Sequence, residues 1–288
     1  MSRRVRAVTD STAQFTDPNF RRIHEVTVVP LTIHLGGQAF RDGVDIDSEE
    51  LLARSAASRE LPVAAAPRVE EFAQTYQDLG QGTVDILSIH VSGKLSATLQ
   101  HARAASQRFL GRATVVPVDS LTTSVGLGLL VQQAVQAAEA GEPVDEIVRI
   151  VRGLIPRMYA IYFTESLDFL QNAGRIPRSQ AVLGGILGMK PFLISEEGDL
   201  LPMEKVRTRA QAAEKLWEFI CEFSEMQFLG ILQENGRVGE EARLLLERLA
   251  LEFPAAKPNL LTYNPFLATI LGPKGLGVVI LESSGKLE

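Results

Sequence analysis

The stretch from Asp85 to Ala102 constrains the fold of this chain more than any other segment. An apolar run that favours a strand leads into a loop of Ser, Gly, Lys and Thr residues, and the sequence after that loop favours a helix. The first N–H groups of a helix have no partner within the helix and carry partial positive charge. A strand, a hydroxyl-rich turn and a helix start in this order predict an anion site.

Two other predicted strands end in turns of the same kind. Val5–Val8 is followed by Thr9–Thr12, and Val115–Val118 is followed by Asp119 and Ser120. Ligands in open parallel sheets bind beyond the carboxyl ends of the strands, so these three turns are expected to line one crevice.

Strands and helices alternate in the first half of the chain. This βαβ pattern predicts a parallel sheet with helices on both faces, and we expect a parallel-sheet α/β/α domain over residues 1–156. The expected strands are Val5–Val8, Val26–Val29, Val84–Ile89 and Val115–Val118, and the expected helices begin near Asp47, Pro67, Ser124 and Pro143.

The second half has a different pattern and predicts a smaller mixed-sheet α/β domain over residues 157–288. Pro191–Ile194 and Leu200–Lys205 read as a β-hairpin with a loop of four or five residues. Further strands are expected at Met158–Thr164, Phe228–Leu232, Asn259–Tyr263 and Gly277–Leu281, and helices at Ser166–Asn172, Ser179–Leu187, Ala210–Phe223 and Glu240–Leu251.

Composition excludes several classes of protein. The net charge of −6 argues against a nucleic-acid partner, and no apolar run approaches the ~18 residues of a membrane-spanning helix. The basic start at Met1–Arg6 is followed by a polar turn where a signal peptide needs an apolar stretch. One cysteine and four histidines without metal-ligand spacing predict no metal site, and no cofactor fingerprint is present. We expect a cytoplasmic protein.

Short motifs along the whole chain resemble those of the DegV-type fatty-acid-binding proteins of bacteria. Each is weak alone, but they occur in the family's order. They are Val8–Thr12, Val29–Leu31 with Asp42-Gly43, the loop Ser92–Thr98, Val118–Ser120, Leu170 with Ala173–Ile176, Lys190-Pro191 and Gly272-Pro273.

The resemblance implies a two-domain fold with a long-chain fatty acid in a tunnel between the domains. Family members are not enzymes themselves, and they present the acyl chain to a partner kinase that phosphorylates its carboxylate. Ser96 matches the family's head-group Ser, and Arg175 matches its Arg. The family's Thr and His are replaced by Ala64 and Ile270.

The residues predicted to bind the ligand surround the loop after the third strand. A carboxylate held there needs hydrogen bonds, because burying it without them is costly. The full predicted set is Ser96, Ala97, Lys94, Gly93, Ala64, Ile270, Arg175 and Ser11, with no catalytic residue.

Two alternatives stay open from the sequence. Loss of the Thr and the His also fits a divergent member that binds a different amphiphilic anion or acts as an interaction module without a ligand. A hydrolase or transferase could instead use Asp10 and Asp119 as general bases, although carboxylates after strands more often accept hydrogen bonds from neighbouring loops.

Overall fold

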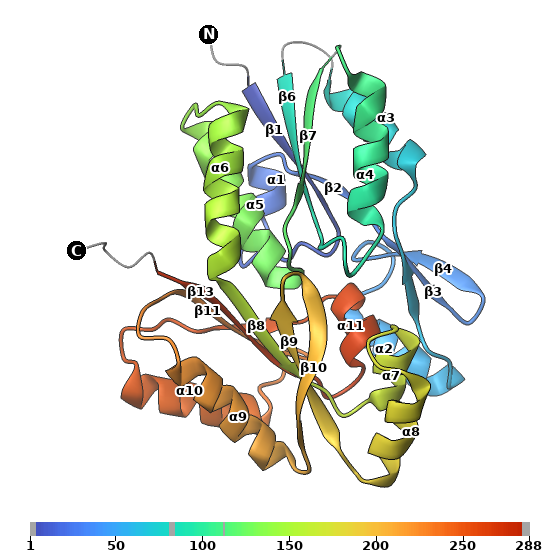
Figure 1. Cartoon of the computed structure of the whole chain (residues 1–288), viewed down its shortest axis with the longest axis vertical. Helices are drawn as coiled ribbons and strands as arrows, with labels where there is room; N and C mark the ends of the chain where they lie inside the picture. Colours follow the sequence, from blue (N-terminus) through green and yellow to red (C-terminus); the bar gives the residue numbers. More distant parts are fainter. Residues whose placement is uncertain (1–3, 81–83, 112, 284–288) are drawn as a thin grey trace.

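The computed structural model describes residues 4–80, 84–111 and 113–283, so residues 1–3 of the basic start lie outside it. A parallel sheet is formed by β2 (Thr27–Val29), β1 (Arg4–Asp10), β6 (Val84–His90) and β7 (Thr114–Asp119), in that order. One face is covered by α3 (Val69–Leu79) and α4 (Thr98–Ser106), and the other by α5 (Ser124–Glu139) and α6 (Val144–Leu154) (Figure 1). The predicted parallel sheet with helices on both faces is confirmed.

The second half of the chain forms a six-stranded mixed sheet, as predicted. Its order is β10 (Asp199–Val206), β9 (Lys190–Glu196), β8 (Met158–Phe163), β13 (Leu276–Glu282), β11 (Met226–Gln233) and β12 (Asn259–Thr262). The pair β11–β12 is parallel and the other neighbours are antiparallel. Helices α9 (Arg209–Cys221) and α10 (Glu240–Glu252) pack on one face (Figure 1).

The β9–β10 turn is tighter than predicted. Only Glu197 and Gly198 separate the two strands, and both have positive φ, of 47° and 86°. Positive φ at both central residues matches the right-handed twist of the flanking strands, which explains why a two-residue turn is favoured over the expected four or five residues.

A third sheet was not predicted. It is antiparallel and comprises β4 (Gln38–Arg41), β3 (Thr32–Leu35) and β5 (Val63–Ala65). The adjacent Gly36 and Gly37 form the turn between β3 and β4 with φ of 60° and 71°. Two adjacent glycines favour a two-residue hairpin turn, so the sequence does carry a local signal for this hairpin although its strands are too short to show a periodic pattern.

Helix α11 (Pro265–Leu271) was also missed, because all seven of its residues are buried and it has no polar face to give helical periodicity. It packs against α2 (Ser48–Ser58), β5 and α7 (Leu167–Asn172), and α7 in turn packs against α8 (Arg178–Ile186) (Figure 1). The remaining short elements are α1 (Phe20–Ile23) and the 3₁₀ turns Gln107–Phe109 and Ile155–Arg157.

One buried cluster continues from the parallel sheet into the six-stranded sheet. Leu127 and Leu130 of α5 belong to it together with Tyr162 of β8 and Val279 of β13. The carboxyl ends of the parallel strands point toward the six-stranded sheet (Figure 1). Side chains from both halves of the chain therefore meet beyond these ends, where the sequence predicts the ligand.

Candidate ligand-binding site

The loop after β6 winds tightly around Ser92. The N–H groups of Leu95 and Ser96 donate to the Ser92 carbonyl at 2.9 and 3.2 Å. Ser96 Oγ lies 2.8 Å from Thr98 Oγ1 and accepts a hydrogen bond from the Thr98 N–H at 3.3 Å. Ser96 is half-buried, while Gly93, Lys94 and Ala97 are exposed. The Ser96 hydroxyl therefore lies at the start of α4, where a helix favours an anion.

Asp10 is buried in a line of polar side chains and does not face solvent. Its Oδ2 accepts from the Val91 N–H at 2.9 Å and lies 3.0 Å from His90 Nδ1. His90 Nε2 lies 2.6 Å from Ser88 Oγ, which lies 2.8 Å from the Tyr76 hydroxyl. The order Asp, His, Ser is that of a hydrolytic triad, but the four side chains in this line have no exposed surface. This line fixes the strand ends and offers no access to a substrate.

Asp119 also binds loop backbone. Its Oδ1 accepts from the Gly93 N–H at 3.3 Å and from the Leu121 N–H at 3.0 Å. The expectation that these two carboxylates hold neighbouring loops is confirmed, and the geometry gives no support for either as a general base.

A pocket of about 130 Å³ lies between β5, the loop after β6, the loop after α7, and α11. It brings together Ala64, Arg175 and Ile270 of the predicted set with Leu95, the neighbour of Ser96. The remaining wall residues are Pro62, Val63, Asn172, Ala173, Phe266 and Thr269. Segments about 200 residues apart thus form one small, mostly apolar site.

Arg175 is the charged residue of this pocket, and its charge is paired. The guanidinium lies 2.8 Å from Asp199 Oδ1, and Nε donates to the Ala173 carbonyl at 3.2 Å. Only 15% of the Arg175 side chain is exposed. Asp199 begins β10, so the β9–β10 hairpin holds this arginine in place, a contact that spacing in the sequence did not reveal.

The tip of the same hairpin reaches the loop after β6. Lys94 Nζ lies 3.6 Å from Glu197 Oε2. A Cβ atom on Gly198 would come within 2.4 Å of Ser92 Oγ and 3.2 Å of Leu121 Cα, so only glycine fits there without movement. The hairpin therefore joins the predicted anion loop to the arginine of the pocket.

Ser11 does not lie on this pocket. Its hydroxyl donates to Asp42 Oδ2 at 2.7 Å and accepts from the Leu31 N–H at 2.9 Å. Ser11 and Asp42 line a separate pocket beside α1. The structure thus separates Ser11 from Ala64, Arg175 and Ile270. The other predicted residues, Gly93, Lys94, Ser96 and Ala97, lie in the loop after β6 and at the start of α4 and do not line the pocket between β5 and α11 themselves.

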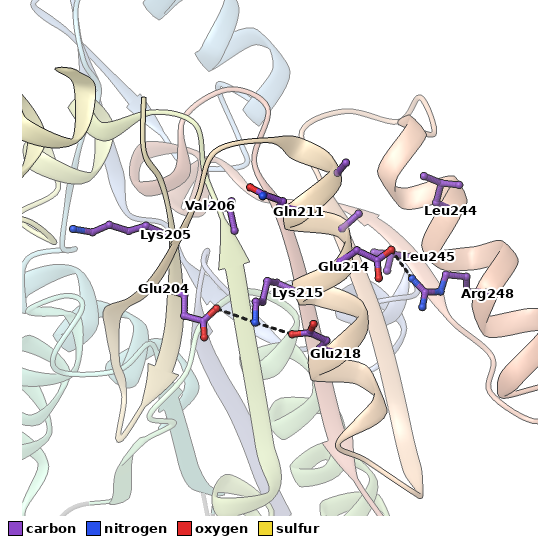
Figure 2. Close-up of a pocket in the computed structure, with 12 residues that line it drawn as sticks. Glu204, Lys205, Val206, Gln211, Glu214, Lys215, Glu218, Leu244, Leu245 and Arg248 are labelled. Atoms are coloured by element: carbon purple, nitrogen blue, oxygen red, sulfur yellow. Dashed lines mark hydrogen bonds and ion pairs between the residues drawn. The ribbon is translucent and has the colours of Figure 1, made fainter. Parts of the chain in front are cut away.

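A larger pocket of about 590 Å³ lies on the other side of the six-stranded sheet, between β10, α9 and α10 (Figure 2). Its rim carries ion pairs from Lys215 to Glu204 and Glu218, at 3.2 and 2.8 Å, and from Arg248 to Glu214 at 2.8 Å. None of the predicted ligand-binding residues lines it.

The described residues contain neither a metal site nor a helix that could span a membrane. Within residues 4–80, 84–111 and 113–283, no three His, Cys, Asp or Glu side chains converge as a metal site requires. No helix in the same ranges combines the length and apolar character needed to cross a membrane.

A family model described as an uncharacterised protein of the DegV family matches residues 4–283. The chain belongs to the DegV family. A DegV domain-containing protein of Streptomyces coelicolor is 33% identical over 282 residues, which cover 97% of this chain and 99% of that protein. The resemblance stated from the short motifs is confirmed.

Solved structures of DegV-family proteins share this fold. A Thermus thermophilus protein, described by its fatty acid binding, superposes with a TM-score of 0.84 at 29% identity, covering 97% of this chain and 100% of that one. DegV of Bacillus subtilis, described as a fatty acid binding protein, gives a TM-score of 0.83 at 26% identity, covering 98% and 100%. The predicted combination of a parallel and a separate mixed sheet is therefore the DegV fold.

Proposed function

We propose that this DegV-family protein binds a long-chain fatty acid between its parallel and six-stranded sheets. The carboxylate is assigned to the loop around Ser96 at the start of α4, and the acyl chain to a tunnel that starts at the pocket between β5 and α11. The observation that carries this proposal is the convergence of Ala64, Leu95, Arg175 and Ile270 on one pocket. The fatty acid binding of the Thermus and Bacillus relatives supports it.

The acyl chain supplies most of the binding free energy in this proposal. Burying about 15 methylene groups at ~0.8 kcal/mol each gives roughly 12 kcal/mol before the costs of association. One neutral hydrogen bond contributes only about 0.5–1.5 kcal/mol. Ala64 and Ile270, which replace polar residues of the family pattern, therefore weaken the head-group contacts without removing the main source of affinity.

The walls of the pocket must separate to admit the whole chain. Sites that enclose ligands of this size have volumes of about 300–1,000 Å³, whereas this pocket measures about 130 Å³. Leu95, Ala64 and Ala173 pack against the buried cluster from the edge of the pocket and are only partly buried themselves. Leu95 is the largest of these three side chains, and a change of its rotamer lengthens the pocket without moving the backbone.

We further propose that the protein is a carrier that presents the carboxylate to a partner kinase. Asp10 and Asp119, the candidate bases, are committed to loop backbone, which argues for binding over catalysis. Lys94 and Gly93 are exposed beside the assigned carboxylate, so a partner enzyme has access to that end of the ligand.

The first test combines native mass spectrometry with lipid extraction of the full-length protein. We expect a mass excess that matches a long-chain fatty acid. Ser96→Ala should weaken fatty acid binding about tenfold, because a hydrogen bond to a charged group is lost. Ser58→Ala, at the exposed end of α2, is the matched control and should leave affinity unchanged. A protein that carries no lipid and takes up no added fatty acid contradicts the proposal.

A different amphiphilic anion is the second candidate, favoured by the apolar side chains of Ala64 and Ile270 in the pocket wall. Ala64→Thr distinguishes the two. If the ligand is a fatty acid, the added hydroxyl should strengthen or preserve binding. If the natural head group is less polar, extraction should yield another amphiphile, and Ala64→Thr should weaken its binding.

A further inference from the structure

A second pocket, of about 480 Å³, lies beside the carboxyl ends of β1 and β2 and shares no wall residue with the pocket between β5 and α11. Ser11 follows β1 and Pro30 follows β2, and both line it. Its size falls within the range of small-molecule sites. It lies at the carboxyl edge of the parallel sheet, the edge at which open α/β sheets bind ligands, and it is one strand away from the switch point between β1 and β6.

Asp42 gives this pocket an uncommitted acceptor. Its side chain is 1% exposed, and its Oδ2 accepts the hydrogen bond from Ser11. No donor among the described residues reaches Oδ1. Nearly all buried polar atoms in folded proteins are hydrogen-bonded, and a buried carboxylate oxygen calls for a charged or strong donor. This oxygen is therefore a candidate contact for an ammonium group.

The opposite charge lines the same pocket. Arg21 and Arg22 of α1 line it and are exposed. Arg22 donates to Asn19 Oδ1 at 3.3 Å, and this neutral partner does not offset the guanidinium charge. Guanidinium groups favour phosphate and carboxylate ligands through their paired N–H donors.

These charges select the ligand class. A simple cation meets repulsion from the two arginines, and a simple anion meets repulsion from Asp42. We propose that this pocket binds a short zwitterion, whose ammonium group donates to Asp42 and whose anionic group lies against Arg21 and Arg22. The proposal concerns a site apart from the fatty acid pocket and does not depend on the proposed function.

O-Phosphoethanolamine is the probe, with ethyl phosphate as the partner that lacks the ammonium group. Isothermal titration calorimetry on the full-length protein at pH 8, where the Asp42 carboxyl is ionised, should show binding of O-phosphoethanolamine and at least about tenfold weaker binding of ethyl phosphate. Asp42→Asn should weaken O-phosphoethanolamine about tenfold or more, whereas ethyl phosphate should bind as well as before or more tightly because the repulsion from Asp42 is removed. This comparison isolates the contact between the ammonium group and Asp42.

The arginine side is tested with Arg21→Gln/Arg22→Gln, which should weaken both probes. Arg152→Gln, an exposed change on α6, is the matched control and should change neither affinity. Circular dichroism checks that each variant is folded, and the wild-type comparison of the two probes stands even if Asp42→Asn does not fold. Equal affinity for both probes, no binding of O-phosphoethanolamine, or no effect of Asp42→Asn in a folded variant overturns the proposal.

Discussion

Asp42 makes the stability of the ligand-free protein depend on pH in an unusual direction. Burial, together with the nearby charge of Asp10, raises the pKa of this carboxyl from 3.8 to about 7. Between these two values the folded protein keeps a proton that the unfolded chain has released. The free energy of unfolding therefore falls as the pH rises through this window.

The magnitude follows from the two pKa values. A tenfold change in proton affinity corresponds to about 1.36 kcal/mol, so ionising Asp42 costs the folded state about 4 kcal/mol once the pH exceeds 7. About 2–3 kcal/mol of this loss falls between pH 5 and pH 8, a range that is convenient for measurement. Asp42→Asn removes the ionisation and keeps an oxygen that accepts the hydrogen bond from Ser11.

Urea denaturation of both proteins at pH 5 and pH 8 tests this reasoning. Asn leaves one buried amide group to be accommodated, which shifts the stability of the variant equally at both pH values. The difference between the variant and the wild type should therefore grow by about 2–3 kcal/mol in favour of the variant from pH 5 to pH 8. A difference that stays constant within about 0.5 kcal/mol refutes the argument that Asp42 is buried with a raised pKa.

Two further substitutions test contacts that hold the site together. Gly198→Ala should lower the free energy of unfolding by about 1–3 kcal/mol more than the control Gly37→Ala. Both glycines have positive φ, but only at Gly198 would an added Cβ contact Ser92. Equal losses of stability for the two variants in urea denaturation would show that this close approach carries no cost. Tyr76→Phe removes the hydroxyl that bonds Ser88 and should cost about 1–2 kcal/mol by the same assay, and an unchanged midpoint would mean that the buried polar line relaxes without it.

Regular elements with clear periodicity were predictable from the sequence. The parallel strands and the helices of the first half follow from β-branched runs, capping residues and terminal glycines, and their bounds agree closely. Helix α11 has equally good end signals, since Asn264 caps it by accepting from the Leu267 N–H at 2.8 Å and Gly272 follows with φ of 64°. The sequence does not predict it, because complete burial removes the polar face that gives a helix its amphipathic periodicity.

The site was predictable in its parts and not in its geometry. Family resemblance selected Ala64, Arg175 and Ile270, which lie on three distant segments, and the structure brings them to one pocket. The partner of Arg175 could not be found in this way, because Asp199 reaches it only through the register of the β9–β10 hairpin. The motif Asp42-Gly43 marked this residue in the sequence but not its burial, since burial of a single Asp leaves no periodic trace.

The β9–β10 hairpin connects the anion loop after β6 with Arg175 of the pocket, and close packing contributes more to this connection than ion pairs do. The Lys94–Glu197 pair has side chains that are 49% and 86% exposed, and such pairs contribute about 0–1 kcal/mol at most. The close approach of Gly198 to Ser92 and Leu121 is therefore what positions the hairpin tip against the anion loop. Asp199 follows directly, so any displacement of the tip also moves the group that holds Arg175. Opening of the pocket should accordingly be governed by packing at Gly198 and be largely insensitive to salt.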